Sequence, residues 1–337
     1  FTVTMFSVGF LANPASARDV RRLIAHASTV TVAERCSMIQ RALIGLARMG
    51  VDRVLIMRDQ GGIAQGLELA QKNRRKDQPL LWPKLEYLEM EVGGEATDTL
   101  NAVTMMCEQE CRVIIVLGGD GTHRLVAHAC GEIPLVCIST GTNNVFPKFI
   151  ESTVAGMAAG ALAVKKVQQE LVCLRNKRLM LEINGKAQIP ALVDICVTSE
   201  DWIGTRALWR PKDLRELYLS FAEPGAIGLS SIGSLVLPRA RELDEGLEIM
   251  MEPSSTNGIK VEAPIAPGLI TEINVDSCRP LRLGEPKSIR IPKGTLALDG
   301  EKEMEFNAED QVKITLDPLG PWSINVDKIM GMLAKNI

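Results

Sequence analysis

One stretch decides the fold: Ile114-Ile115-Val116-Leu117-Gly118-Gly119-Asp120-Gly121-Thr122. Its apolar half is typical of a strand buried on both faces of a parallel sheet, and we predict this strand over residues 112–117. The glycines allow the backbone to approach a phosphate group closely, and a helix predicted over 122–130 adds a positive N-terminus. Asp120 in this setting indicates a Mg²⁺ ligand or a base. An aspartate that caps the helix, with glycine turns around it, is the alternative.

Strands and helices alternate on both sides of this stretch. We expect further strands at 6–13, 52–57, 84–92 and 134–138, and helices at 31–49, 63–72, 96–110 and 153–167. Strands separated by helices are typical of crossover units and a parallel sheet. The first part of the chain is therefore predicted to be an α/β domain.

The pattern changes after the helix at 153–167. From about Glu170 the apolar runs are short, and turn signals separate them at 184–185, 224–225, 257–258, 267–268 and 299–300. This spacing predicts an antiparallel β domain. We expect an α/β domain over 1–168, a β domain over 169–320, and a C-terminal helix within 321–337 that returns to the first domain.

Composition excludes several classes of protein. The chain has 337 residues, of which 46% are hydrophobic and 23% charged, as in ordinary globular proteins. The net charge of -3 gives no cationic field for nucleic acid or an anionic membrane. The apolar start at 1–13 is interpreted as a strand rather than a signal peptide. Eight cysteines without a C-x-x-C motif are typical of reduced thiols, so we expect a cytoplasmic protein without nucleic-acid or membrane partners.

A second polar loop follows the next predicted strand. The run Thr140-Gly141-Thr142-Asn143-Asn144 offers uncharged hydroxyls and amides, which suit hydrogen bonds to a phosphate, a ribose or a purine. Such a loop is common on its own, but two of them at neighbouring strand ends are more specific for a nucleotide. No G-x-x-x-x-G-K-[ST] and no G-x-G-x-x-G motif occurs, which disfavours a P-loop protein and a dinucleotide-dependent dehydrogenase.

These two loops together resemble the superfamily of NAD kinases, diacylglycerol kinases, sphingosine kinases and, more remotely, 6-phosphofructokinases. The run 12–16 is similar to the Asn-Pro turn of the lipid-kinase branch, and Leu298-Asp299-Gly300-Glu301 is similar to its Asp-Gly-Glu motif. Residues 13–24 and 140–147 most resemble the ATP-NAD kinase-like branch called acetoin catabolism protein X.

The resemblance implies a Rossmann-like parallel-sheet domain, a C-terminal β-sandwich and a nucleotide cleft between them, with ATP and Mg²⁺ as cofactors. It implies Asp120 and Glu301 as candidate bases, and Asp120 and Asp299 as metal ligands. The residues that would hold the nucleotide are Asn13, Gly118, Gly119, Gly121, Thr122, Thr140, Gly141, Thr142, Asn143 and Asn144. The cations nearest to these elements in sequence are Arg124, Lys148, Arg206 and Arg210.

The acceptor side departs from the family pattern. NAD kinases carry an Asn before an acidic residue where this chain has Val193-Asp194, so only Asp194 matches and NAD is a questionable acceptor. Ser230 and Ser231 lie in a segment loosely similar to the acceptor loop of NAD kinases. The first hypothesis is an ATP-dependent kinase that phosphorylates a nucleotide or a small metabolite and is linked to acetoin catabolism. A non-catalytic nucleotide-binding accessory protein is the second, and a lipid kinase the third. A homodimer or tetramer is expected.

Overall fold

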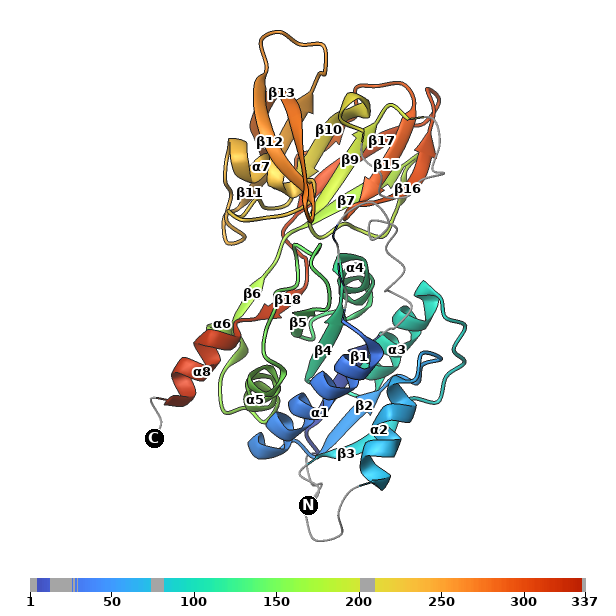
Figure 1. Ribbon diagram of the computed structural model, residues 1–337, viewed down its shortest axis with the longest axis vertical. Coiled ribbons are helices and arrows are strands. Elements are labelled where there is room, and N and C mark those ends of the chain that lie inside the picture. The colour runs from blue at the N-terminus through green and yellow to red at the C-terminus, as the bar shows by residue number, and fades with distance from the viewer. Residues whose placement is uncertain are drawn as a thin grey trace.

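The computed structural model describes residues 5–12, 26, 28, 30–73, 82–200 and 210–334 (Figure 1). Their first part holds a seven-stranded sheet of order β3-β2-β1-β4-β5-β18-β6. Neighbouring strands from β3 to β18 are parallel, and β6 is antiparallel to β18. The bounds are β1 Ser7–Ala12, β2 Arg53–Ile56, β3 Lys84–Tyr87, β4 Val113–Gly118, β5 Leu135–Ser139, β6 Cys173–Arg175 and β18 Trp322–Ile324.

Helices cover both faces of this sheet. The helices are α1 Val32–Met49, α2 Ile63–Lys72, α3 Ala96–Glu108, α4 Asp120–Ala129, α5 Ser152–Ala163, α6 Gln169–Val172 and α8 Val326–Ala334. Apolar side chains of α1, α2, α5 and α8 form one core with the sheet, and those of α3 and α4 form the other. Glycines bring α1 and α5 into close contact, because a side chain on Gly45 or Gly156 would meet the backbone of the facing helix.

The expected elements of this part are present, with differences at their ends. The helix at 63–72 has the expected bounds. Helix α4 begins at Asp120, two residues earlier than expected, because Gly119 is its N-cap. Helix α3 is capped by Glu95, which forms a capping box with Asp98. The third strand ends at Tyr87 and not at residue 92.

The second part consists of two antiparallel sheets packed face to face. One has the order β12-β13-β11-β10-β9-β15-β16 and the other β14-β17-β7-β8. A buried cluster that includes Leu181, Val197 and Leu316 fills the space between them, so the predicted β-sandwich is confirmed. The bounds are β7 Arg178–Ile183, β8 Lys186–Ala187, β9 Asp194–Thr198, β10 Leu214–Leu219, β11 Glu245–Met251, β12 Ile259–Ala266, β13 Leu269–Arg282, β14 Lys287–Ser288, β15 Gly294–Leu298, β16 Glu301–Phe306 and β17 Val312–Asp317, with a 3₁₀ helix Pro211–Asp213 and α7 Ser230–Val236.

The two parts are joined by two crossings of the chain. The chain leaves the first sheet after β6 and returns to it at β18, which pairs with β5 on one side and β6 on the other. Helix α8 follows β18 and packs against α5 and α6. Figure 1 shows α4 at the junction, directly below the antiparallel sheets.

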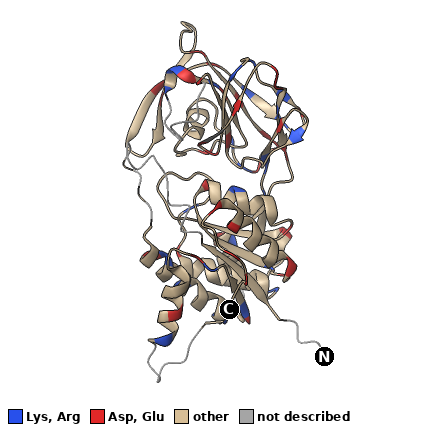
Figure 2. Cartoon of the chain, turned by 90° about the vertical axis from the view of Figure 1, so that its right-hand side faces the viewer, with Lys and Arg blue, Asp and Glu red and all other residues tan. Residues whose placement is uncertain are grey.

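Charge and hydropathy of the described residues add two observations. Figure 2 shows lysines and arginines interspersed with acidic residues on both parts of the chain. None of the helices in the described ranges combines the length and the apolar character that a membrane crossing requires.

Candidate active site at the junction of the two parts

The carboxyl ends of β4 and β5 bring the two predicted loops together. Gly118 pairs with Ser139 in the sheet, and the Thr140 N–H donates to the Gly118 carbonyl at 3.3 Å. A Cβ on Gly118 would lie 2.7 Å from Thr122 Cβ, and one on Gly119 would lie 2.8 Å from Asn144 Oδ1. A side chain at Gly118 would therefore collide with Thr122 in the first turn of α4, and a side chain at Gly119 would collide with Asn144 of the second loop.

Hydrogen bonds hold the second loop in one shape. The Asn144 side-chain amide donates to Ser139 Oγ at 2.8 Å and to the Gly141 carbonyl at 3.2 Å. Thr142 Oγ1 accepts from the Ser28 N–H at 3.0 Å. Thr140 and Asn143 are buried. The predicted nucleotide-binding residues of this loop are thus brought next to the glycine-rich strand end.

Asp120 holds the second loop next to the first through hydrogen bonds. Its Oδ1 accepts from the Phe146 N–H at 2.8 Å, and both carboxylate oxygens accept from the Val145 N–H, at 3.1 and 3.0 Å. The residue is only 8% exposed. In this arrangement the carboxylate positions the loop at 140–146, which is a role that the glycine-rich motif alone did not indicate.

Arg241, from the second part of the chain, holds the same two peptide groups from the other side. Its Nη1 donates to the Phe146 carbonyl at 3.0 Å and its Nη2 to the Val145 carbonyl at 2.8 Å. The guanidinium lies 4.1 Å from the ring centre of Phe221 and its Nε is 3.1 Å from Glu223 Oε1. We call Asp120, Val145, Phe146 and Arg241 the Val145–Phe146 clamp.

Asp299 makes a comparable anchor in the second part. It lies in the β15–β16 turn with φ of 49°, and its carboxylate accepts the N–H groups of residues 192, 193 and 194 at 2.7–3.2 Å. Arg124, from α4, places Nε 3.7 Å from its Oδ2. Burial raises the pKa of Asp299 to about 6, although Arg124 opposes that shift.

Glu301 lies over the start of α4. The first residue of β16, it is exposed, and its Oε1 would be 3.7 Å from a Cβ placed on Gly121. The N-cap of α4 is Gly119, which has no side chain to accept a helix N–H, and the start of the helix directs N–H groups and partial positive charge toward this point. The junction thus combines glycine-lined backbone, a helix N-terminus and one exposed carboxylate.

Comparison with known sequences identifies the family of this chain. Residues 8–166 match the ATP-NAD kinase N-terminal domain family, and residues 177–319 match the acetoin catabolism protein X C-terminal domain family. The acetoin catabolism protein X of Cupriavidus necator is 41% identical over 328 residues, which cover 96% of this chain and 91% of the relative. The chain belongs to the acetoin catabolism protein X family. A solved diacylglycerol kinase structure from Bacillus anthracis str. Sterne is 15% identical with a TM-score of 0.37, covering 81% of this chain and 96% of its own.

In this member of the acetoin catabolism protein X family, the predicted acceptor residues are buried rather than exposed at the junction surface. Ser230 and Ser231 are buried, and their hydroxyls donate to the carbonyls of Ile227 and Gly228. Asp194 is buried at the start of β9. As placed, none of the three offers an exposed group to an acceptor. Asn13 and Arg206 fall outside the described residues.

The predicted metal ligands do not fit a preformed metal site. Both oxygens of Asp120 accept loop N–H groups, and the buried carboxylate of Asp299 accepts three N–H groups beside Arg124. Over the described ranges, no group of three or more His, Cys, Asp or Glu side chains could hold an ion. The two aspartates anchor backbone instead.

Two junction residues have roles that sequence reasoning missed. Arg241 is distant in sequence from both loops, and its neighbourhood carries no motif that marks it. His123 is fully buried, with Nδ1 2.8 Å from the Gly119 carbonyl, so Nδ1 carries the proton that it donates. Burial lowers its pKa to about 4, and the neutral ring packs beside Phe146.

Proposed function

We propose that this protein is an ATP-dependent phosphotransferase that moves a phosphoryl group to a hydroxyl of a small metabolite. The observation that carries the proposal is the N-terminus of α4, whose N-cap, Gly119, has no side chain and follows Gly118 at the junction. Phosphate groups bind favourably at such a helix start. The name of its relative from Cupriavidus necator links that protein to acetoin catabolism, and a hydroxyketone such as acetoin carries a hydroxyl acceptor.

Glu301 is the proposed base. It is exposed and lies next to Gly121 at the start of α4, where a carboxylate could accept the proton of the attacking hydroxyl. Asp120 and Arg241 would act as positioning residues, because they hold the Val145–Phe146 peptides and so the loop beside the phosphates. Mg²⁺ would enter with the nucleotide, since ATP-bound Mg²⁺ takes most of its ligands from phosphates and water.

A nucleotide-binding accessory protein is the second candidate function. It is favoured by Asp120 and Asp299, whose carboxylates are both used to hold backbone N–H groups. If Glu301 alone cannot support catalysis, the same junction would bind nucleotide without turnover. NAD is the least favoured acceptor, since Val193 stands where NAD kinases carry an asparagine.

ATP consumption and thermal shift together test the proposal. We expect ATP with Mg²⁺ to raise the melting temperature, and one acceptor among hydroxyketones, polyols, nucleosides and NAD to drive ATP consumption. Glu301→Gln should slow turnover about 10²- to 10⁴-fold while ATP still stabilises the variant. Glu305→Gln, on the same strand, is the matched control and should retain turnover.

The outcomes separate the two functions. Stabilisation of the wild type by ATP without consumption of any acceptor supports the accessory protein. Full turnover by Glu301→Gln removes that residue from catalysis. A wild type that no nucleotide stabilises overturns both functions.

A further inference from the structure

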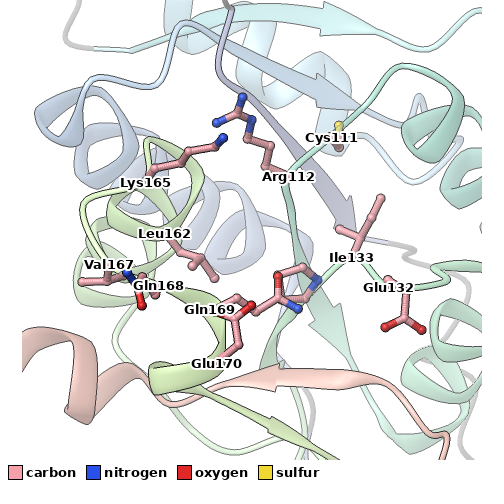
Figure 3. A pocket seen from close by; sticks show the side chains of 11 residues that line it. Cys111, Arg112, Glu132, Ile133, Leu162, Lys165, Val167, Gln168, Gln169 and Glu170 are labelled. Atoms are coloured by element: carbon pink, nitrogen blue, oxygen red, sulfur yellow. The ribbon is translucent and has the colours of Figure 1, made fainter.

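A cavity of about 690 Å³ lies at the opposite edge of the parallel sheet from the glycine-rich strand ends. It opens beside the amino ends of β4 and β5, between the end of α5 and the start of α6 (Figure 3). A cavity of this volume accommodates a small organic molecule. The residues that matter for its chemistry are Arg112, Ile133, Pro134, Leu162, Lys165 and Gln169.

One end of the cavity is positively charged. Figure 3 shows the Arg112 and Lys165 side chains at the same end. Across the described ranges, neither side chain forms an ion pair with a carboxylate. The two carboxylates of the lining, Glu132 and Glu170, lie away from this end in Figure 3, and Glu132 is paired with Arg175 at 2.7 Å. Two neighbouring cations without a counterion repel each other, so an anion placed between them would be bound favourably.

Arg112 is already oriented for such a contact. Its Nη1 donates to the Ala163 carbonyl at 3.1 Å, and its guanidinium lies 4.8 Å from the ring centre of Phe6. These two contacts fix the plane of the group and leave other N–H donors of its fork for a ligand. A guanidinium held in this way binds a carboxylate or phosphate through paired hydrogen bonds.

Lys165 occupies a backbone position that favours glycine. It follows α5 with φ of 61°, in the left-handed region, and its N–H donates to the Leu162 carbonyl at 3.0 Å. Glycine is the usual residue at this point of a helix end. The chain thus carries a cationic side chain at the cavity in a place where glycine would suit the backbone better.

We propose that this cavity is a second ligand site, which binds a small organic anion. The carboxylate or phosphate of the ligand would lie between Arg112 and Lys165, and its apolar body would pack on Ile133, Pro134 and Leu162. The site is separate from the junction, because the whole length of β4 lies between Arg112 and Gly118. The proposal does not depend on the proposed phosphotransferase activity.

Calorimetric titration of the full chain tests the proposal with three probes of equal chain length: hexanoate, hexyl phosphate and hexan-1-ol. We expect at least one anion to bind about tenfold or more tightly than the alcohol. A preference for hexanoate or for hexyl phosphate identifies the head group. Equal binding of all three, or no binding, overturns the proposal.

Two lysine variants locate the binding. Lys165→Gly should weaken the anion about tenfold while the melting temperature stays the same or rises, because glycine suits the left-handed backbone. Lys166→Gln, at the exposed neighbour outside the cavity lining, should change the affinity less than twofold. If Lys165→Gly binds the anion as the wild type does, the proposal is wrong. Arg112→Gln is a second variant and should also lose the preference for the anion.

Discussion

Asp120, at the start of α4, and Asp299, in the β15–β16 turn, lie in different parts of the chain, and each stands directly before a glycine. Each carboxylate accepts backbone N–H groups from a loop distant in sequence. They differ in the cation that faces them: Arg124 lies 3.7 Å from Asp299 itself, whereas Arg241 binds the carbonyls of the loop that Asp120 holds. The comparison shows that an Asp-Gly pair in this fold can serve as a backbone anchor.

One arginine from each part of the chain crosses the junction to the other part. Arg124 extends from the first part to the anchor of the second, and Arg241 extends from the second part to the loop anchored in the first. Both side chains are buried, where ion pairs and charge-assisted hydrogen bonds are sensitive to removal of one partner. Variants at these four residues therefore test whether the two anchors are equivalent.

The largest effect is expected for Asp299→Ala. Removal of this buried carboxylate takes away the acceptor of three N–H groups and the negative charge that faces Arg124, and should lower the free energy of unfolding by about 3–5 kcal/mol. Urea denaturation at pH 7 measures it. Asp317→Ala removes a less buried partner of Arg178 and should cost about 1 kcal/mol. Equal losses of stability in the two variants would show that Asp299 contributes no more than the less buried Asp317.

The pH dependence of stability should have opposite signs in the two parts. Because the pKa of Asp299 is raised to about 6, its contribution to stability is lost as the pH rises from about 4 to 6. The pKa of His123 is lowered to about 4, so its contribution is lost as the pH falls from about 6.5 to 4. Each group should change the free energy of unfolding by about 3 kcal/mol over its pH range.

Denaturation of the wild type, Asp299→Asn and His123→Gln between pH 4 and 7 separates the two contributions. With rising pH, the wild type should lose stability relative to Asp299→Asn and gain stability relative to His123→Gln. If both stability differences changed in the same direction with rising pH, one of the two groups would not be buried as the structure describes it.

A smaller effect is expected for Arg241→Lys. Lysine keeps the charge but cannot donate to the Val145 and Phe146 carbonyls through a planar fork, so the free energy of unfolding should fall by about 2 kcal/mol. Arg178→Lys, at a half-buried ion pair, is the matched control for the same substitution. A loss no greater than that of the control would argue against the Val145–Phe146 clamp.

The smallest effect is expected for Asp120→Asn. The amide keeps one acceptor oxygen for the Phe146 N–H, so we expect a loss of about 1 kcal/mol. A double-mutant cycle with Arg241→Lys should give a coupling of about 0.5–3 kcal/mol, because both residues hold the same two peptide groups. A coupling of zero would mean that the anchor and the arginine act independently.

Local patterns in the sequence were sufficient to predict most elements of the first part. Apolar runs and helical spacing predicted the parallel strands and the helix at 63–72, and glycines at two strand ends predicted that the loops at 118–122 and 139–144 would meet. The three-residue strand β18 is too short for such a pattern, since its place depends on pairing with β5 and β6.

The contacts that complete the site could not be predicted from local patterns. An aspartate among glycines is compatible with a metal ligand, a base or a backbone anchor, and the partner of Asp120 lies 25 residues along the chain. Arg241 lies 95 residues from Phe146, so the cations expected near the site, which were chosen by their proximity in sequence, did not include it. Burial of Ser230 and Ser231 follows from the packing of α7, which no single motif shows.

The position of β18 has a consequence for the order in which the protein folds during synthesis. This strand lies between β5 and β6, yet it leaves the ribosome after every residue of the second part. The edge of β5 that β18 covers therefore stays open until every strand of the second part has left the ribosome. A chain that ends just before Trp322 would therefore contain every strand of the second part, while its first sheet would lack the strand that joins β5 to β6.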